Sequence, residues 1–118
     1  MSELQTVELE SPRMPPAAAA IALPLVLVAD ADPASRVRRT RQLEERGFRV
    51  AVSRTPFETI VKASCHLPDL ILVDTSLGDA GADEATELLS TCPATAHIPI
   101  VRLTAGRRVP TRVLAAAR

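Results

Sequence analysis

The side chains most able to do chemistry in this sequence are polar residues that directly follow apolar runs. Four residues occupy such positions: Asp30, Asp32, Asp74 and Thr104. Carboxylates that meet at one edge of a sheet can jointly hold a hard cation such as Mg²⁺, which prefers oxygen ligands. Such a cation would offset the repulsion between an aspartate and an incoming phosphoryl group, and a threonine hydroxyl could donate to a phosphoryl oxygen. From spacing alone, the alternative stays open that Asp30 and Asp74 only cap strands and accept loop amides.

The elements that must position these side chains alternate between strands and helices. Short apolar runs predict four strands, at residues 25–29, 48–52, 70–73 and 98–103. Continuous apolar runs are typical of strands buried on both faces of a parallel sheet. Helical patterns over residues 33–46, from residue 56, over 83–89 and from residue 110 separate or follow the strands. This order predicts a doubly wound α/β sheet, in which ligands collect at the carboxyl ends of the strands.

Local residues mark several helix ends. Asp32 before Pro33 predicts a helix start, and Gly47 predicts the end of that polar, arginine-rich helix. The stretch Thr55-Pro56-Phe57-Glu58 is a capping box with proline at the first helical position. Four residues at helical spacing are expected to face the core from this second helix: Phe57, Ile60, Val61 and Cys65.

Composition limits the domain organisation. The 118 residues suit one domain, and the predicted division is a disordered tail over residues 1–23 followed by a domain over residues 24–118. The cysteines and histidines show no metal-binding spacing. The acidic N-terminus does not resemble a signal peptide, and the apolar run over residues 17–29 is too short to span a bilayer. We therefore expect a soluble, cytoplasmic protein with no membrane partner.

The charges balance overall but not along the chain. There are 14 basic and 14 acidic residues, yet no Asp or Glu follows Glu87 and five arginines do. Such a basic stretch could contact nucleic acid or an acidic partner. With no aromatic residues between the arginines to stack on bases, a solvated helix end is the favoured interpretation, and we do not expect a nucleic-acid partner.

Three segments together resemble the signature stretches of response-regulator receiver domains, in the right order and at the right separation. They are Leu25-Val26-Leu27-Val28-Ala29-Asp30, Pro68-Asp69-Leu70-Ile71-Leu72-Val73-Asp74 and His97-Ile98-Pro99-Ile100-Val101-Arg102-Leu103-Thr104-Ala105. The resemblance covers about residues 24–114 and implies a flavodoxin-like fold and a role in two-component phosphorelay signalling. It implies that Asp74 becomes 4-aspartylphosphate, with a histidine kinase or a histidine phosphotransfer protein as donor. By the same resemblance, Thr104 senses the phosphoryl group, and Mg²⁺ is held by Asp30, Asp74 and the carbonyl of Ser76.

The chain also departs from the family pattern at several positions. The second acidic residue of the pair, a metal ligand in the family, falls at Ala31, so Mg²⁺ binding should be weak unless Asp32 substitutes. The family proline and glycine after the acceptor correspond to Gly78 and Ala82, which predicts a differently shaped and more flexible loop.

The largest departure concerns the end of the domain. The family's fifth strand, with its active-site lysine, and its fifth helix are missing, and Lys62 in the second helix cannot replace that lysine. Four strands therefore remain, and one sheet face should lose its covering helix. The fourth strand should form an edge through which the protein could self-associate.

Three functional hypotheses follow. In the first, the chain is a phosphorelay receiver that accepts phosphate on Asp74, either as a fragment of a longer chain or as a trimmed variant. In the second, it is a pseudo-receiver that binds proteins independently of phosphorylation. The third, a small α/β nucleotide- or flavin-binding enzyme, is disfavoured because no glycine-rich loop follows the first strand. We expect a signalling domain rather than an enzyme.

Overall fold

The structure is a computed structural model that describes residues 23–104 and 107–117. Four parallel strands form one sheet in the order β2-β1-β3-β4. The strands are β1 (Leu25–Ala29), β2 (Arg49–Ser53), β3 (Leu70–Asp74) and β4 (Ile100–Leu103). The helices are α2 (Pro33–Glu45), α3 (Pro56–His66), the short 3₁₀ helix η2 (Thr75–Leu77), α4 (Asp79–Thr91) and α5 (Thr111–Ala116). The predicted parallel α/β sheet is confirmed, whereas the predicted tail over residues 1–23 lies almost wholly outside the described residues.

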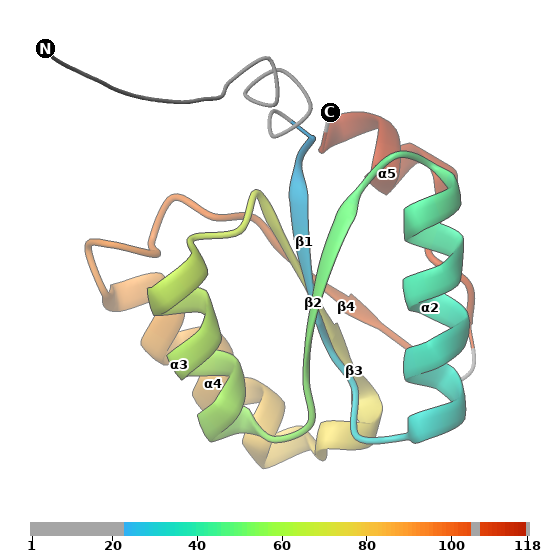
Figure 1. The fold of residues 1–118 in the computed structure, drawn as a ribbon. Helices are drawn as coiled ribbons and strands as arrows, with labels where there is room; N and C mark the ends of the chain where they lie inside the picture. Colours follow the sequence, from blue (N-terminus) through green and yellow to red (C-terminus); the bar gives the residue numbers. More distant parts are fainter. Residues whose placement is uncertain (1–22, 105–106, 118) are drawn as a thin grey trace, which may run out of the picture.

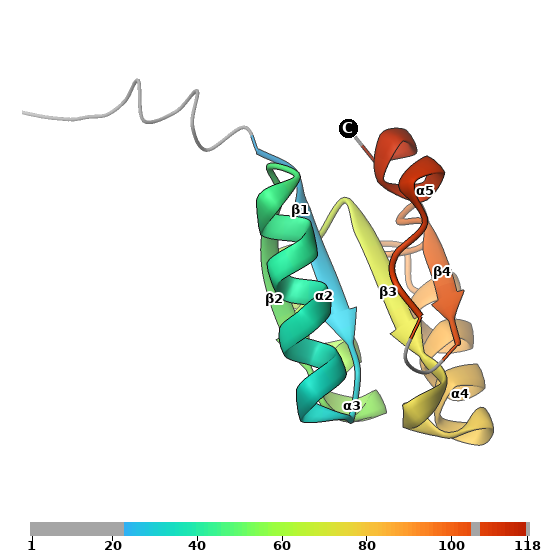
Figure 2. The same ribbon diagram turned by 90° about the vertical axis from the view of Figure 1, so that its right-hand side faces the viewer.

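Helices cover both faces of the sheet. Helices α3 and α4 lie on one face, and α2 and α5 lie on the other (Figures 1 and 2). Alternation along β1 directs Val26 and Val28 into the core under α2, and Leu27 and Ala29 into the core under α3 and α4. All five residues of β3 are buried, as expected of a central strand in a parallel sheet.

The expectation that one sheet face lies uncovered is wrong. Val109 and Leu114 are each 2% exposed and belong to the core cluster that contains Val26 and Leu72. The side-chain amide of Gln42 on α2 also donates to the Val109 carbonyl (3.0 Å) and accepts from its amide (3.1 Å). The segment after β4 thus turns back over the sheet, because burial of its apolar side chains outweighs the cost of ordering a short chain.

The predicted helix ends are confirmed. The carboxylate of Asp32 accepts the Ser35 amide at 3.0 Å, and Gly47 has a φ of +88° just beyond α2. The Thr55 hydroxyl accepts the Glu58 amide at 3.0 Å at the start of α3. These ends were predictable because each depends on hydrogen bonds between neighbours in the sequence.

The predicted buried face of α3 is confirmed only at Ile60, which is partly buried and packs against the core under α3 and α4. Phe57 is 76% exposed and Val61 41% exposed, while Cys65 is also exposed. The buried residues are instead Thr59 and Ala63. Burial of Thr59 is tolerated because its hydroxyl bonds the Thr55 carbonyl and the Ser53 hydroxyl, each at 2.7 Å. The small Ala63 faces the sheet. The apolar pattern therefore predicted the helix correctly but did not predict which of its faces is buried.

Helix α4 begins at Asp79, before the predicted start at residue 83, and therefore contains Gly81. A Cβ atom at this position would lie 2.7 Å from Cγ of Pro56, at the first position of α3. The glycine therefore permits the close approach of α3 and α4 rather than a flexible loop. No helix in the described ranges is long and apolar enough to cross a membrane.

We expect Gly81→Ala to destabilise the protein, although Gly-to-Ala inside a helix ordinarily stabilises by about 1 kcal/mol. The reason is the clash with the Pro56 ring. Urea denaturation followed by circular dichroism measures the effect. In a protein that already carries Pro56→Ala, the ring is absent, so Gly81→Ala should stabilise the protein as it ordinarily does in a helix. A stabilising effect in the unmodified background would show that α3 and α4 do not pack this closely.

Candidate functional site

The candidate site lies at the carboxyl ends of β1, β3 and β4, toward which the strand arrows point (Figure 2). Asp30 directly follows β1, and Asp74 is the last residue of β3. Asp74 pairs in register with Leu103, so Thr104 comes immediately beyond the same edge. The parallel pairing therefore brings three of the predicted residues to one end of the sheet.

Asp74 is almost completely buried and has a partner on each carboxylate oxygen. Its side chain is 1% exposed. Oδ1 accepts a hydrogen bond from Nη1 of Arg39, and Oδ2 accepts the Ser76 amide at 2.7 Å. Burial raises the pKa of the Asp74 carboxyl, but hydrogen bonds from Ser76 and the ion pair with Arg39 outweigh burial. The pKa consequently lies below its ordinary value, so Asp74 is ionised.

Asp30 is fully buried and organises the loop that follows β1. Its Oδ1 accepts the Asp32 amide at 2.9 Å and the Ser76 hydroxyl at 3.0 Å. Its Oδ2 accepts the Ser35 hydroxyl at 2.5 Å and Nη1 of Arg39 at 3.2 Å. Asp30 thus accepts loop amides, as the alternative from spacing predicted, and also shares a cation with Asp74.

Arg39 is the residue that sequence reasoning missed. Its side chain is 3% exposed, and Nη1 contacts both Asp30 and Asp74. The opposite side of the guanidinium donates to backbone carbonyls: Nη2 to Thr104 (3.0 Å) and Arg107 (2.8 Å), and Nε to Arg107 (3.1 Å). One side chain from α2 thereby links the acidic pair to the chain that follows β4.

A signal for Arg39 existed in the helical spacing. Ser35, Arg39 and Leu43 are four residues apart and form the buried stripe of α2. From the sequence we described this helix only as polar and arginine-rich, and we assigned none of its arginines to the site. A charged residue in phase with a buried leucine must find a buried partner of opposite charge, and here that partner is the acidic pair.

Ser76 contacts both carboxylates through its hydroxyl and its amide, whereas the prediction concerned its carbonyl. Its hydroxyl donates to Asp30 and accepts the Ala31 amide at 2.9 Å, while its own amide donates to Asp74. The family resemblance had assigned its carbonyl as a metal ligand, a role that stays a prediction. In the structure, the side chain and amide of Ser76 fix the distance between the ends of β1 and β3.

The side chains of Thr104 and Asp32 do not contact the acidic pair in the part of the chain that the structure describes, and the phosphoryl-sensing role of Thr104 stays a prediction. The Thr104 side chain is exposed, and within the described ranges its hydroxyl makes no hydrogen bond to either carboxylate. The carboxylate of Asp32 caps α2 through the Ser35 amide. Asp32 is therefore occupied as a helix cap.

The arrangement does not fit Mg²⁺ well. Mg²⁺ requires about six oxygen ligands in near-octahedral geometry. Only two carboxylates converge here, Ala31 stands at the position of a third, and the described residues contain no group of three or more His, Cys, Asp or Glu that could hold a metal. A guanidinium already contacts an oxygen of each carboxylate.

The lowered pKa of Asp74 predicts a specific loss of stability in acid. A depressed pKa in the folded state means that ionised Asp74 stabilises the fold at neutral pH. That contribution is present above the unfolded-state pKa of about 3.9 and is lost as the pH falls through the lower folded-state value. We expect urea denaturation at stepped pH to show this loss in the wild type and a shallower acid limb in Asp74→Asn. Superimposable acid limbs would contradict the ionised, ion-paired state.

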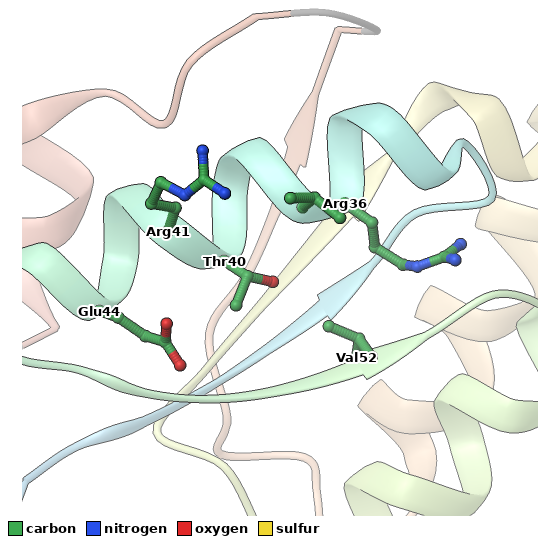
Figure 3. Close-up of a pocket in the computed structure, with 6 residues that line it drawn as sticks. Arg36, Thr40, Arg41, Glu44 and Val52 are labelled. Atoms are coloured by element: carbon green, nitrogen blue, oxygen red, sulfur yellow. The ribbon is translucent and has the colours of Figure 1, made fainter.

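The surface beside the site is rich in arginine. A shallow pocket of about 320 Å³ lies between α2 and β2, and Figure 3 shows Arg36 extending away from Arg41 and Glu44 along it. The Arg36 guanidinium donates to the Asp30 carbonyl at 3.0 Å. A second pocket of about 240 Å³ lies between α2 and residues 107–108. Neither pocket contains a second pair of carboxylates, so the chemistry stays with Asp30 and Asp74.

No family model matches the sequence, and no curated protein matches it either. Solved structures do. The N-terminal domain of a response regulator receiver protein from Methanoculleus marisnigri JR1 is 29% identical, with a TM-score of 0.66 over 80% of this chain and 76% of that chain. The chemotaxis protein CheY4 of Vibrio cholerae is 21% identical, with a TM-score of 0.66 over 81% of each chain.

A third similar structure is the signal receiver domain of a signal transduction histidine kinase from Syntrophus aciditrophicus. It is 24% identical, with a TM-score of 0.64 over 79% of this chain and 70% of that chain. At the lower identities the likeness concerns the fold alone. Together with the acidic residues at the carboxyl ends of β1 and β3, the shared sheet shows that the chain has the fold of response-regulator receiver domains and supports a receiver domain.

Proposed function

We propose that this chain is a phosphorelay receiver in which Asp74 accepts a phosphoryl group from a phosphohistidine. Its receiver fold supports a role in phosphorelay signalling in general. The observation that carries the proposal is the state of Asp74. Its carboxylate is ionised at the end of a central strand, with a buried guanidinium on one oxygen and an amide on the other. The donor is a histidine kinase or a histidine phosphotransfer protein.

The transfer requires a nucleophile and stabilisation of charge. A carboxylate oxygen of Asp74 attacks the phosphorus, the phosphorus–nitrogen bond of the phosphohistidine breaks, and the imidazole nitrogen keeps the electron pair. The product is the mixed anhydride 4-aspartylphosphate. Because phosphoryl transfer depends mainly on positioning and electrostatics, the Arg39 guanidinium is suited to contact an equatorial phosphoryl oxygen as negative charge accumulates there.

Access to Asp74 requires a local rearrangement. At 1% exposure its oxygens cannot meet a donor unless Arg39 and the chain after β4 move outward. Phosphorylation raises the negative charge at this position to nearly two. The added charge competes for the guanidinium that holds the Thr104 and Arg107 carbonyls, so the phosphorylation state of Asp74 is coupled to that segment.

A second candidate is a binding module that works without phosphorylation. The observation that favours it is the saturation of the acidic pair. Every carboxylate oxygen of Asp30 and Asp74 already has an internal partner, and both side chains are buried. In this case Asp30, Asp74 and Arg39 hold the ends of β1, β3 and β4 together, and the protein acts through partner contact.

Intact-mass spectrometry separates the two candidates. The wild type is incubated with acetyl phosphate or phosphoramidate, with and without Mg²⁺. We expect an adduct of one phosphoryl group that hydroxylamine removes, as it does from acyl phosphates. Asp74→Asn should abolish the adduct, whereas Asp79→Asn, which changes an exposed aspartate of α4, should retain it. An adduct that survives Asp74→Asn would move the acceptor elsewhere, and the absence of any adduct would favour the binding module.

A further inference from the structure

We infer that Arg39 is the resident cation of the Asp30–Asp74 pair, and that this guanidinium rather than Mg²⁺ offsets the repulsion between the two carboxylates. The inference concerns the site of the proposed phosphorylation and, for the transfer step, rests on that proposal. The resting site can be tested without any phosphoryl donor. Arg39 thus has the role that the sequence led us to expect from a metal ion, which is to offset the negative charge of the two aspartates.

The charges around the pair call for one buried cation. Asp30 and Asp74 are 0% and 1% exposed, and the described residues bring no other cationic side chain into hydrogen-bond contact with their carboxylates. Two neighbouring buried carboxylates without a cation would repel each other and lose their hydration. Arg39, itself 3% exposed, contacts both and leaves the cluster with one net negative charge.

The position of the guanidinium excludes a metal from the same place. Nη1 contacts Oδ2 of Asp30 and Oδ1 of Asp74, the carboxylate oxygens that a cation lying between the two aspartates would use. The remaining oxygens, Oδ1 of Asp30 and Oδ2 of Asp74, accept from Ser76. A metal could enter only after these hydrogen bonds had been replaced.

The fixed shape of the guanidinium explains why an arginine serves here. Its donors diverge, so one side contacts carboxylates while the other contacts the carbonyls of Thr104 and Arg107. A lysine ammonium could balance the charge but could not supply this fork. Ala31 is consistent with this arrangement, since a third carboxylate at that position would add a further negative charge to a cluster that already carries one.

Thermal unfolding and Mn²⁺ binding test the inference on the full chain. Mn²⁺ is the spectroscopic substitute for Mg²⁺, and electron paramagnetic resonance measures its free concentration. We expect the wild type to show no saturable Mn²⁺ binding at millimolar concentrations and no rise of the melting temperature with MgCl₂ beyond that of an NaCl control at equal ionic strength. These wild-type measurements decide the question even if a variant fails to fold.

Arg39→Gln removes the cation, and Arg38→Gln is the matched control. Arg38 is the preceding residue of α2, is exposed, and makes no ion pair among the described residues. We expect Arg39→Gln to melt at least about 10 °C below the wild type, because it leaves two buried carboxylates without their partner. Arg38→Gln should have the same melting temperature as the wild type. The deficit of Arg39→Gln should also shrink as the pH approaches about 4, where carboxylates protonate.

Two results would overturn the inference. One is saturable Mn²⁺ binding by the wild type that Asp74→Asn abolishes. The other is a melting temperature of Arg39→Gln equal to that of Arg38→Gln, or a deficit that does not change with pH, as a packing role alone would give. Neither depends on phosphorylation, so a failure to phosphorylate Asp74 would leave this inference intact.

Discussion

Replacing Leu114 by alanine should lower the free energy of unfolding by about 2–5 kcal/mol, the range measured for buried leucines. Leu114 is 2% exposed and belongs to the core cluster with Val26, Leu72 and Leu103. Truncation would leave a cavity between α5 and the sheet. In a domain of this size, such a loss lowers the melting temperature by at least about 10 °C.

The control for this prediction lies on the same short helix. Arg112 is exposed, so Arg112→Ala should leave stability almost unchanged. Urea denaturation followed by circular dichroism compares both variants with the wild type. Equal stabilities of Leu114→Ala and Arg112→Ala would mean that α5 does not pack against the sheet in solution, and the expectation of an uncovered face would then return.

The parts of the fold that the sequence predicted are those determined by neighbours in the chain. The runs at residues 25–29 and 70–73 are apolar at every position, so their burial on both faces needed no knowledge of the helices. Asp32, Gly47 and Thr55 act on amides or turns within a few residues. Asp30 and Asp74 could be placed at one sheet edge because parallel strands bring their carboxyl ends together.

The features that escaped prediction depend on contacts between distant segments. Arg39 is one of five arginines between Arg36 and Arg46, and only its phase relative to Leu43 separates it from those in solvent. The orientation of α3 was misjudged because Thr59 obtains its partners from the fold rather than from its own polarity. The docking of α5 depends on Val109 and Leu114 meeting a surface formed by strands far away in the sequence.

The same docking changes the expectation for self-association. An uncovered face would favour nonspecific association, but α5 covers it, so the edge of β4 becomes the remaining route. The Pro99 carbonyl accepts the Ile71 amide at 3.0 Å and therefore faces β3. Because backbone groups alternate along a strand, the amides and carbonyls of Ile100 and Arg102 face away from β3. Among the described residues no strand pairs with that edge.

A groove beside this edge adds apolar surface to the unpaired backbone. It has a volume of about 460 Å³ and lies between the start of β4 and α5, with Leu70, Val101 and Val113 among its lining residues. A second copy related by a twofold axis would place two β4 strands antiparallel, so each copy would supply both the edge and the groove. We therefore expect sedimentation velocity to show a concentration-dependent dimer.

Substitutions at Arg102 distinguish edge pairing from other modes of association. Arg102→Pro removes an outward-facing amide without breaking a hydrogen bond to β3, and it should shift the protein to a monomer at concentrations where the wild type is dimeric. Arg102→Ala, which loses the exposed ion pair with Asp83 but keeps the amide, should still dimerise. Both variants lose the ion pair with Asp83, but only Arg102→Pro loses the outward-facing amide and places a ring at that edge. A dimer that persists in folded Arg102→Pro would show that β4 is not the contact, and so would a wild type that stays monomeric at every concentration.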